Sequence, residues 1–169
     1  MLSPPFETWT PAYIALGSNL NDPAAQLSAA IEYTKQIQNT RLVSQSSLYK
    51  SVPLGPQDQP DFVNAVIGVI TKLDAQSLLA ALQAIENNMG RVPPAQRWGP
   101  RVIDLDILLY GDLRSDDATL QLPHPEMHRR NFVMVPLAEI APSLVILRQG
   151  SVGRLAETLG INGLEKIAL

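Results

Sequence analysis

The segment at residues 102–109, Val-Ile-Asp-Leu-Asp-Ile-Leu-Leu, is apolar except for two aspartates placed two residues apart. Because side chains of a β-strand alternate between two faces, this run predicts a buried strand with Asp104 and Asp106 on one face. The other face is expected to carry Ile103, Leu105, Ile107 and Leu109. Two ionised carboxylates side by side repel each other, and burying one without a partner is costly. A positive group therefore has to lie beside them, either an arginine side chain or a metal ion.

Length, composition and charge narrow the class of protein. The chain has 169 residues, 46% of them hydrophobic and 17% charged, which is typical of one globular domain. We therefore expect a single domain over residues 1–169, with residues 1–11 flexible. The formal net charge of −3 does not indicate binding to nucleic acid or to anionic membranes. The absence of cysteine excludes disulfides and thiolate metal sites.

The sequence shows no sign of export or of membrane insertion. No basic region followed by an apolar stretch precedes the first expected strand, and no apolar run approaches membrane-spanning length. We therefore expect a cytoplasmic protein that acts as a monomer.

The order of the expected elements predicts the fold class. Strands are expected at residues 13–18, 41–52, 61–71 and 102–109. Asn21 or Asp22 can cap a helix that begins with Pro23, and Asp74 can cap a second helix. The order strand, helix, strand, strand, helix, strand predicts an α+β, ferredoxin-like βαββαβ fold with an antiparallel sheet. A C-terminal appendage with a short helix near 152–159 follows, and such a fold by itself selects no function.

Arginines are concentrated in two places. Nine of the thirteen basic residues are arginines; Arg91, Arg97 and Arg101 lie within eleven residues, and Arg129 and Arg130 are adjacent. Guanidinium groups match phosphate oxygens, so a mildly acidic chain that gathers them indicates an anion site. The proline-rich segment around the first three could close over a ligand. A Walker-type phosphate loop is absent, so a nucleotide would be held by side chains and metal.

The strand expected at residues 61–71 carries an aromatic ring beside an amide. Phe62 and Asn64 share one face, opposite Val63 and Ala65. Ordinary core packing explains Phe62 alone, but a buried asparagine has to be satisfied by hydrogen bonds. A ring that stacks and an amide that bonds an edge suit a flat heterocyclic ligand.

The sequence allows more than one interpretation of the histidine pair at 124 and 128 and of the polar pair at 83 and 86. His124 lies between two prolines and therefore off any helix, which argues against a zinc pair with His128. His124 is better suited to donate to a phosphate, and His128 is expected at the surface. Gln83 and Glu86 lie three residues apart on the second helix, where a solvated polar face is the simpler interpretation.

Four segments in order carry a family resemblance: YIALGSNL, PLGPQDQPDFVNAV, RWGPRVIDLDIL and the stretch from LPHP to EIAP. Together they resemble the 6-hydroxymethyl-7,8-dihydropterin pyrophosphokinases of folate biosynthesis, from about Tyr13 to beyond Pro142. The resemblance implies transfer of pyrophosphate from ATP to the pterin hydroxyl, with release of AMP.

The same resemblance implies roles for individual residues. Asp104 and Asp106 would bind two Mg²⁺ ions, and the catalytic set would be Arg91, Arg101, Asp104 and Asp106. The ATP site would comprise Gln83, Glu86, Arg91, Trp98, Arg101, Ile107, His124 and Arg130. The pterin site would comprise Ser51, Pro53, Leu54, Gly55, Phe62, Asn64, Trp98 and Phe132.

Three positions depart from better-known members of that family. Phe62 stands where tyrosine is frequent, Val52 replaces a frequent proline, and Pro93 occupies a place where some members have a basic residue. The last change bears on how many cations of the segment meet ATP, since Arg97 is the nearest substitute.

Two other functions are compatible with the residues alone. One is a different metal-dependent phosphoryl or nucleotidyl transferase that uses the same aspartate pair. The other is a ferredoxin-like regulatory module that binds a small ligand without turnover, which would not need a carboxylate pair with convergent arginines.

Overall fold

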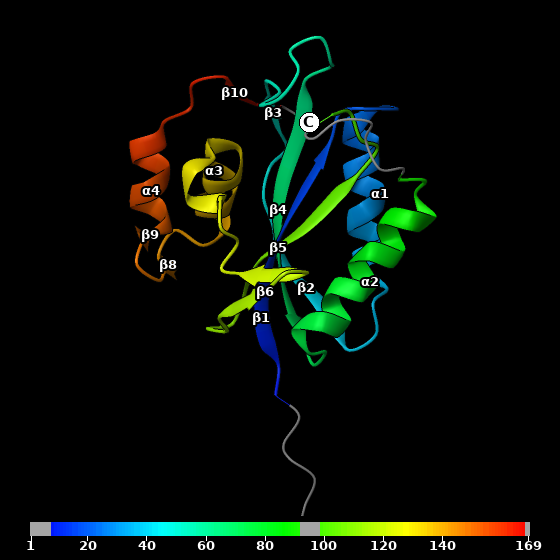
Figure 1. Ribbon diagram of the computed structural model, residues 1–169, viewed down its shortest axis with the longest axis vertical. Helices are drawn as coiled ribbons and strands as arrows, with labels where there is room; N and C mark the ends of the chain where they lie inside the picture. Colours follow the sequence, from blue (N-terminus) through cyan, green and yellow to red (C-terminus); the bar gives the residue numbers. More distant parts are fainter. Residues whose placement is uncertain (1–7, 92–98, 168–169) are drawn as a thin grey trace, which may run out of the picture.

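The computed structural model describes residues 8–91 and 99–167. A six-stranded sheet forms the centre of the molecule, with α1 and α2 on one face and α3 and α4 on the other (Figure 1). The strands of this sheet are β1 (Thr10–Ser18), β2 (Thr40–Gln45), β3 (Tyr49–Ser51), β4 (Phe62–Thr71), β5 (Asp104–Tyr110) and β10 (Leu164–Lys166). The helices are α1 (Pro23–Lys35), α2 (Ala75–Asn88), α3 (Asn131–Ile140), α4 (Val152–Leu159) and the short 3-10 helix η1 (Met127–Arg129). Two small hairpins complete it, β6 (Ser115–Asp117) with β7 (Leu120–Leu122), and β8 (Val145–Ile146) with β9 (Gly150–Ser151).

The strand order confirms the predicted fold class. β4 lies between β1 and the edge formed by β2 and β3, β1 pairs with β5 on its other side, and every pairing is antiparallel. This is the arrangement of the βαββαβ unit. The C-terminal appendage adds α3 and α4 to the second face and returns through β10 to pair with β3.

Both helices of the first face begin where capping residues predict. The Asp22 side chain accepts a hydrogen bond from the Ala25 amide at 3.4 Å, with Pro23 in the first helical position. The Asp74 side chain accepts from the Ser77 amide at 2.7 Å. The helices therefore start at local signals that need no tertiary contact.

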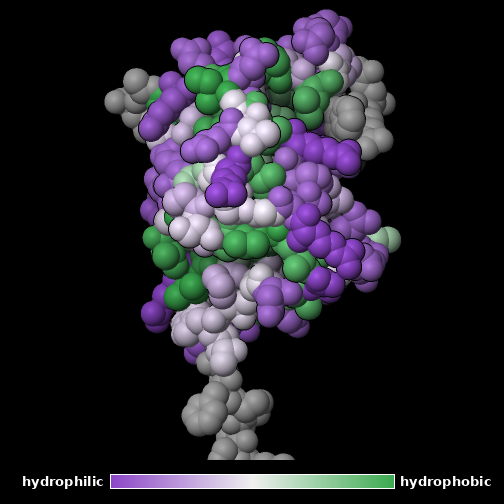
Figure 2. All heavy atoms as spheres, turned by 90° about the vertical axis from the view of Figure 1, so that its left-hand side faces the viewer, coloured by the Kyte–Doolittle hydropathy of each residue, from purple (hydrophilic) through white to green (hydrophobic). Residues whose placement is uncertain are grey.

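The sheet separates two apolar cores. Alternate residues of β1, such as Ile14, pack with α1 and α2, whereas Tyr13 and Ala15 contact the layer of α3 and α4. The outer surface of that second layer carries apolar side chains in groups separated by hydrophilic ones (Figure 2). None of the helices in the described residues is both long enough and apolar enough to cross a membrane.

Two strands depart from the regular alternation. The strand expected at 41–52 is divided into β2 and β3, and between them the Ser46 hydroxyl accepts a hydrogen bond from the Val66 amide at 2.9 Å. In β5 the register shifts between Ile107 and Leu109, so that Leu108 is an extra residue. The expectation that Leu109 faces the first core is therefore wrong, since it packs beside Leu108 in the second core.

The ends of the expected elements also change. β1 begins at Thr10, and residues 10 and 11 pair with β4. The prediction that the flexible N-terminal segment extends to residue 11 is therefore wrong for these two residues. No pattern predicted α3, because Pro136 lies inside it. The helix is held by its packing on the sheet, where Val133, Met134 and Leu137 are buried.

Candidate active site

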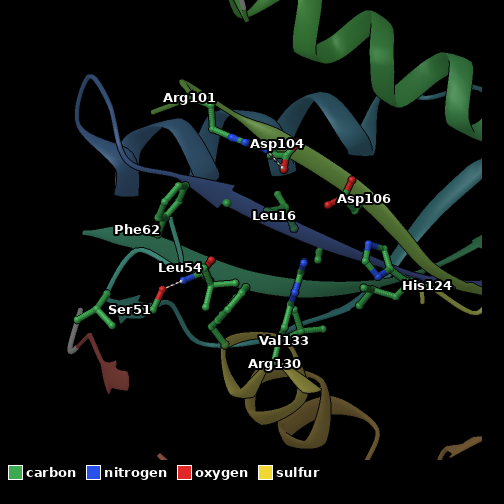
Figure 3. A pocket seen from close by; sticks show the side chains of 16 residues that line it. Leu16, Ser51, Leu54, Phe62, Arg101, Asp104, Asp106, His124, Arg130 and Val133 are labelled. Atoms are coloured by element: carbon green, nitrogen blue, oxygen red, sulfur yellow. Dashed lines mark hydrogen bonds and ion pairs between the residues drawn. The ribbon is translucent and has the colours of Figure 1, made fainter. Parts of the chain in front are cut away.

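A pocket opens between the sheet and α3, at the end of β1 that leads into α1. Asp104 and Asp106 of β5 lie on one side of the pocket (Figure 3). Val133 of α3 and Arg130, which directly precedes α3, face them from the other side. The lining residues are Ala15, Leu16, Gly17, Ser51, Val52, Leu54, Phe62, Asn64, Arg101, Asp104, Asp106, Leu108, His124, Arg130, Phe132 and Val133. Ten of these sixteen were predicted as site residues from the sequence.

Two arginines form ion pairs with Asp104, one of the two aspartates. Arg101 Nη1 lies 2.8 Å from Asp104 Oδ2, and Arg91 Nη2 lies 3.3 Å from Asp104 Oδ1 (Figure 3 shows the first pair). The two arginines therefore supply positive charge beside Asp104, as the sequence required. These two contacts leave neither oxygen of Asp104 without a guanidinium partner.

Asp106 has a different environment. Within the described residues it forms no ion pair. Removal from solvent raises the pKa of Asp106 to about 7, and the charges of Asp104 and Glu86 act in the same direction. The charges of Arg101 and Arg130 act in the opposite direction, so Asp106 lies among charges of both signs without a direct ion-pair partner in the described residues.

Glu86 belongs to this cluster and does not lie on a solvated helix face. Its side chain is buried, and Oε2 accepts the Leu105 amide at 3.0 Å. Arg91 Nε lies 3.6 Å from the same oxygen, and burial raises the pKa of Glu86 to about 7. The solvated-face interpretation is thus wrong for Glu86, whereas Gln83 is exposed and does not line the pocket.

The other end of the pocket combines aromatic rings with an amide. Phe62 and Phe132 both line it, and buried Asn64 donates from Nδ2 to Ser51 Oγ at 2.6 Å. A Cβ atom at Gly17 would lie 3.4 Å from Asn64 Oδ1, so glycine leaves this amide accessible from the neighbouring strand. This end has the shape and chemistry for a flat, hydrogen-bonding ring system.

The segment after β3 is held by its own side chains. Gln57 Nε2 donates to the carbonyl oxygens of Pro53 at 2.8 Å and Gly55 at 3.1 Å. Leu54 lines the pocket, whereas Pro53 and Gly55 do not. The carbonyl groups of two residues predicted for the pterin site therefore each accept a hydrogen bond from within the segment.

His124 and Arg130 lie between the carboxylates and α3. His124 Nδ1 accepts the Glu126 amide at 3.2 Å, which leaves Nε2 to carry the proton of the neutral ring. Burial lowers the pKa of His124, and the charge of Arg130 lowers it further. The pair therefore offers a neutral donor and a fixed cation, both suited to phosphate oxygens.

The remaining residues singled out in the sequence do not line the pocket or fall outside the described residues. The Ile107 side chain is buried in the core on the opposite face of the sheet, so any role of Ile107 in a nucleotide site rests on its backbone. His128, which was expected at the surface and not in the site, belongs to η1 and does not line the pocket. Trp98 and Arg97 lie outside the described residues.

Asn19 holds the backbone of a pocket residue, although the sequence analysis did not single it out. It is 1% exposed, and its amide donates to Gln59 Oε1 and to the Pro60 carbonyl, both at 2.9 Å. Its Oδ1 accepts the Arg101 amide at 2.9 Å. Asn19 thus ties the backbone of Arg101 to the segment before β4. The only local signal was an amide directly after a buried strand.

Other lining residues that the sequence did not indicate are apolar or lack a side chain. They are Ala15, Leu16, Gly17, Val52, Leu108 and Val133. Such residues give no chemical signal in a sequence, since they shape the walls and do not bind through polar atoms.

Comparisons with known proteins agree on one family. Residues 13–142 match the family model described as 7,8-dihydro-6-hydroxymethylpterin-pyrophosphokinase. A 2-amino-4-hydroxy-6-hydroxymethyldihydropteridine pyrophosphokinase of Haemophilus influenzae is 58% identical over 135 residues, 80% of this chain and 84% of that protein. The protein of the same name from Pseudomonas aeruginosa is 46% identical over 155 residues, 92% and 95% of the two chains.

Solved structures show the same fold at low sequence identity. The wild-type Plasmodium falciparum HPPK-DHPS structure with pterin and p-hydroxybenzoate superposes with a TM-score of 0.76 at 14% identity. The match covers 98% of this chain and 48% of that one, so the chain spans about half the length of this structural relative.

Proposed function

The chain belongs to the 7,8-dihydro-6-hydroxymethylpterin-pyrophosphokinase family, and we propose that it transfers pyrophosphate from ATP to the hydroxyl of 6-hydroxymethyl-7,8-dihydropterin, with Mg²⁺ held by Asp104 and Asp106. It is accordingly an enzyme of the pyrophosphokinase class, which acts in folate biosynthesis. The observation that carries the proposal is that one pocket joins a carboxylate pair to an end built of Phe62 and Asn64. The reaction needs both, one for phosphates and one for a pterin.

The carboxylates fit magnesium. Asp106 is partly buried, lies beside two other acidic groups and has no ion-pair partner in the described residues, which favours a cation. The described residues contain no cluster of three or more side chains able to hold a metal. Magnesium usually takes one or two carboxylates and completes its shell with water and substrate phosphates. When bound, two such ions would neutralise the triphosphate and orient the attacking hydroxyl.

Arg91 and Arg101 have two roles in this proposal. Without ligand they neutralise Asp104 through contacts of 3.3 and 2.8 Å. A triphosphate offers more negative charge, and guanidinium groups bind it bidentately. We expect both side chains to turn from Asp104 to the phosphates, which would stabilise charge on the transferred group and free Asp104 for the cation.

The remaining residues would orient the two substrates. His124 and Arg130 would bind phosphate oxygens through a neutral N–H and a fixed charge. Phe62 and Phe132 would stack on the pterin, while Asn64 would bond its edge. Trp98 and the rest of the segment from Arg91 to Arg101 would close over both substrates.

The domain organisation, oligomeric state and location of the enzyme belong to the same proposal. We propose that it forms a single domain and works as a cytoplasmic monomer on small-molecule substrates. One continuous sheet shared by all layers supports the single domain. Size-exclusion chromatography with light scattering would test the oligomeric state.

Nucleotide analysis tests the reaction. The enzyme would be incubated with ATP, Mg²⁺ and 6-hydroxymethyl-7,8-dihydropterin, and the products separated by chromatography. AMP in a one-to-one ratio with pterin diphosphate is expected. ADP would indicate an ordinary phosphoryl transferase, and binding of the pterin without turnover would indicate a regulatory module.

A further inference from the structure

The turn between α4 and β10, residues 160–163, contacts both walls of the pterin end of the pocket. On the α3 side, Asn131 Nδ2 donates to the Gly160 carbonyl at 3.2 Å and to the Asn162 carbonyl at 2.9 Å. Asn131 lies between Arg130 and Phe132, which both line the pocket. One amide group therefore holds the turn to the start of α3.

The same turn is joined to the edge of the sheet. The Val52 amide donates to the Gly163 carbonyl at 3.4 Å, and Leu164 of β10 is paired with Ser51 of β3. Gly163 has φ +72°, and a Cβ atom there would lie 3.4 Å from the Val52 side chain. Ser51 and Val52 line the pocket opposite α3. Figure 1 shows the chain leaving α4 and passing over the end of α3 to reach β10 beside β3.

We infer that Asn131 is a positioning residue for the pterin, and that it acts by holding the turn at 160–163 as a strap between α3 and β3. This inference rests on the proposed function. Glu139, near the other end of α3, joins that helix directly to Ser47 and Tyr49. The strap holds the end of α3 that carries Phe132, and thus controls the width of the slot between Phe132 and the wall of Ser51 and Val52.

The side chain of Asn131 is well suited to this role. Both acceptors are backbone carbonyls, and only an amide nitrogen supplies two N–H donors from a side chain this short. A carboxylate of the same size would place a negative oxygen against those two carbonyls. The Asn131 amide touches no group that the proposed chemistry uses.

The strap should affect one substrate much more than the other. β10 pairs only with β3, whereas Asp104 and Asp106 lie on β5, which pairs only with β1 among the described strands. Loosening the strap should therefore widen the pterin slot and affect the phosphate end much less, since of the residues proposed to bind phosphate only Arg130 adjoins Asn131.

The test measures both affinities in Asn131→Asp and Asn131→Ala. Calorimetry would use 6-hydroxymethylpterin as the pterin probe and Mg²⁺ with α,β-methylene-ATP as the nucleotide probe. Pterin binding should weaken by about three- to tenfold, as expected when modest hydrogen bonds are lost, with the nucleotide Kd and kcat changed less than about twofold. Asn162→Ala is the matched control, because it alters the same turn but keeps the carbonyl that accepts from Asn131.

Amide hydrogen exchange on the ligand-free enzyme tests the strap independently of any substrate. Protection at Val52 and at residues 160–163 should fall in Asn131→Asp and persist in Asn162→Ala. Unchanged exchange, unchanged pterin affinity, or equal weakening of both ligands would overturn the inference. A wild-type enzyme that binds no pterin would contradict the proposed function itself, while exchange would still decide whether the strap exists.

Discussion

At the scale of single residues, the two aspartates of the site differ in their partners, and the two ends of the pocket differ in charge. Asp104 meets two guanidinium groups, whereas Asp106 lies beside Glu86 and Asp104 with no ion-pair partner in the described residues. Asn64 is satisfied by one hydroxyl, that of Ser51, and presents its oxygen toward Gly17. Charged groups thus gather at one end of the pocket and neutral donors and acceptors at the other.

Removing either aspartate should separate binding from chemistry. We expect Asp104→Ala and Asp106→Ala to fold and to retain much of their pterin affinity. Turnover should fall by at least about a hundredfold, the scale on which a stabiliser of transition-state charge acts. Steady-state assays over a range of Mg²⁺ concentrations, with pterin calorimetry as the control, would measure this. Near-normal turnover in either variant would contradict the metal assignment.

Asn64→Ala should weaken pterin binding far more than nucleotide binding. The change removes an amide and leaves the buried Ser51 hydroxyl without its partner, at a cost of about 1–3 kcal/mol. Phe62→Tyr is the matched control on the same strand, because it keeps the ring and should be tolerated. Equal pterin affinities in Asn64→Ala and the wild type would exclude this strand from the pterin site.

At the scale of elements, α3 is attached to the sheet edge by a carboxylate. Glu139 Oε1 accepts from the Ser47 amide at 2.9 Å and its hydroxyl at 2.7 Å, and Oε2 accepts from the Tyr49 hydroxyl. Burial raises the pKa of Glu139, but these hydrogen bonds outweigh it and the net pKa is lowered. α3, which carries one wall of the pocket, is therefore fastened to β3 in a pH-dependent way.

The lowered pKa of Glu139 sets the sign of a stability change. A carboxylate with a depressed pKa in the folded state stabilises the protein above its unfolded pKa, and the effect is lost as pH falls through the folded value. Glu139→Gln should therefore lower the free energy of unfolding at pH 7 by about 0.5–1 kcal/mol, a small value because the side chain is largely exposed and screened. Urea denaturation should show this difference shrinking below about pH 4. A difference that stays constant with pH would rule out the carboxylate as its source.

At the scale of the whole molecule, the pocket and the N-terminal tryptophan lie at opposite ends of β1. Trp9 precedes β1 and packs against Arg41 and Lys72, whose charged groups lie 4.7 and 5.0 Å from its ring centroid. The pocket is built around Gly17, at the other end of the strand. The chain's only other tryptophan, Trp98, belongs to the segment proposed to close over the substrates.

Trp9→Phe should thus leave one fluorescent reporter of closure. Addition of Mg²⁺, α,β-methylene-ATP and 6-hydroxymethylpterin should change the emission of Trp98 and protect the segment from Arg91 to Arg101 from proteolysis. Trp98→Phe, which keeps Trp9 alone, is the control and should respond little. Equal protection with and without ligands would contradict a closing segment.

The sequence by itself determined those features that depend on neighbours a few residues away. The caps at Asp22 and Asp74, the shared face of Asp104 and Asp106, and that of Phe62 and Asn64 all follow from short-range geometry. The order of strands and helices, read from the same local patterns, was enough to predict the βαββαβ sheet.

Only the tertiary structure decided how distant segments meet. Glu86 is buried because the Leu105 amide, far along the chain, supplies its hydrogen bond, and Leu109 changes faces because Leu108 is an extra residue opposite β1. Asn131 and Asn19 acquire their roles from backbone groups that the fold brings to them. Periodicity and capping depend on geometry repeated within one segment, whereas burial and long-range hydrogen bonding depend on which segments pack together.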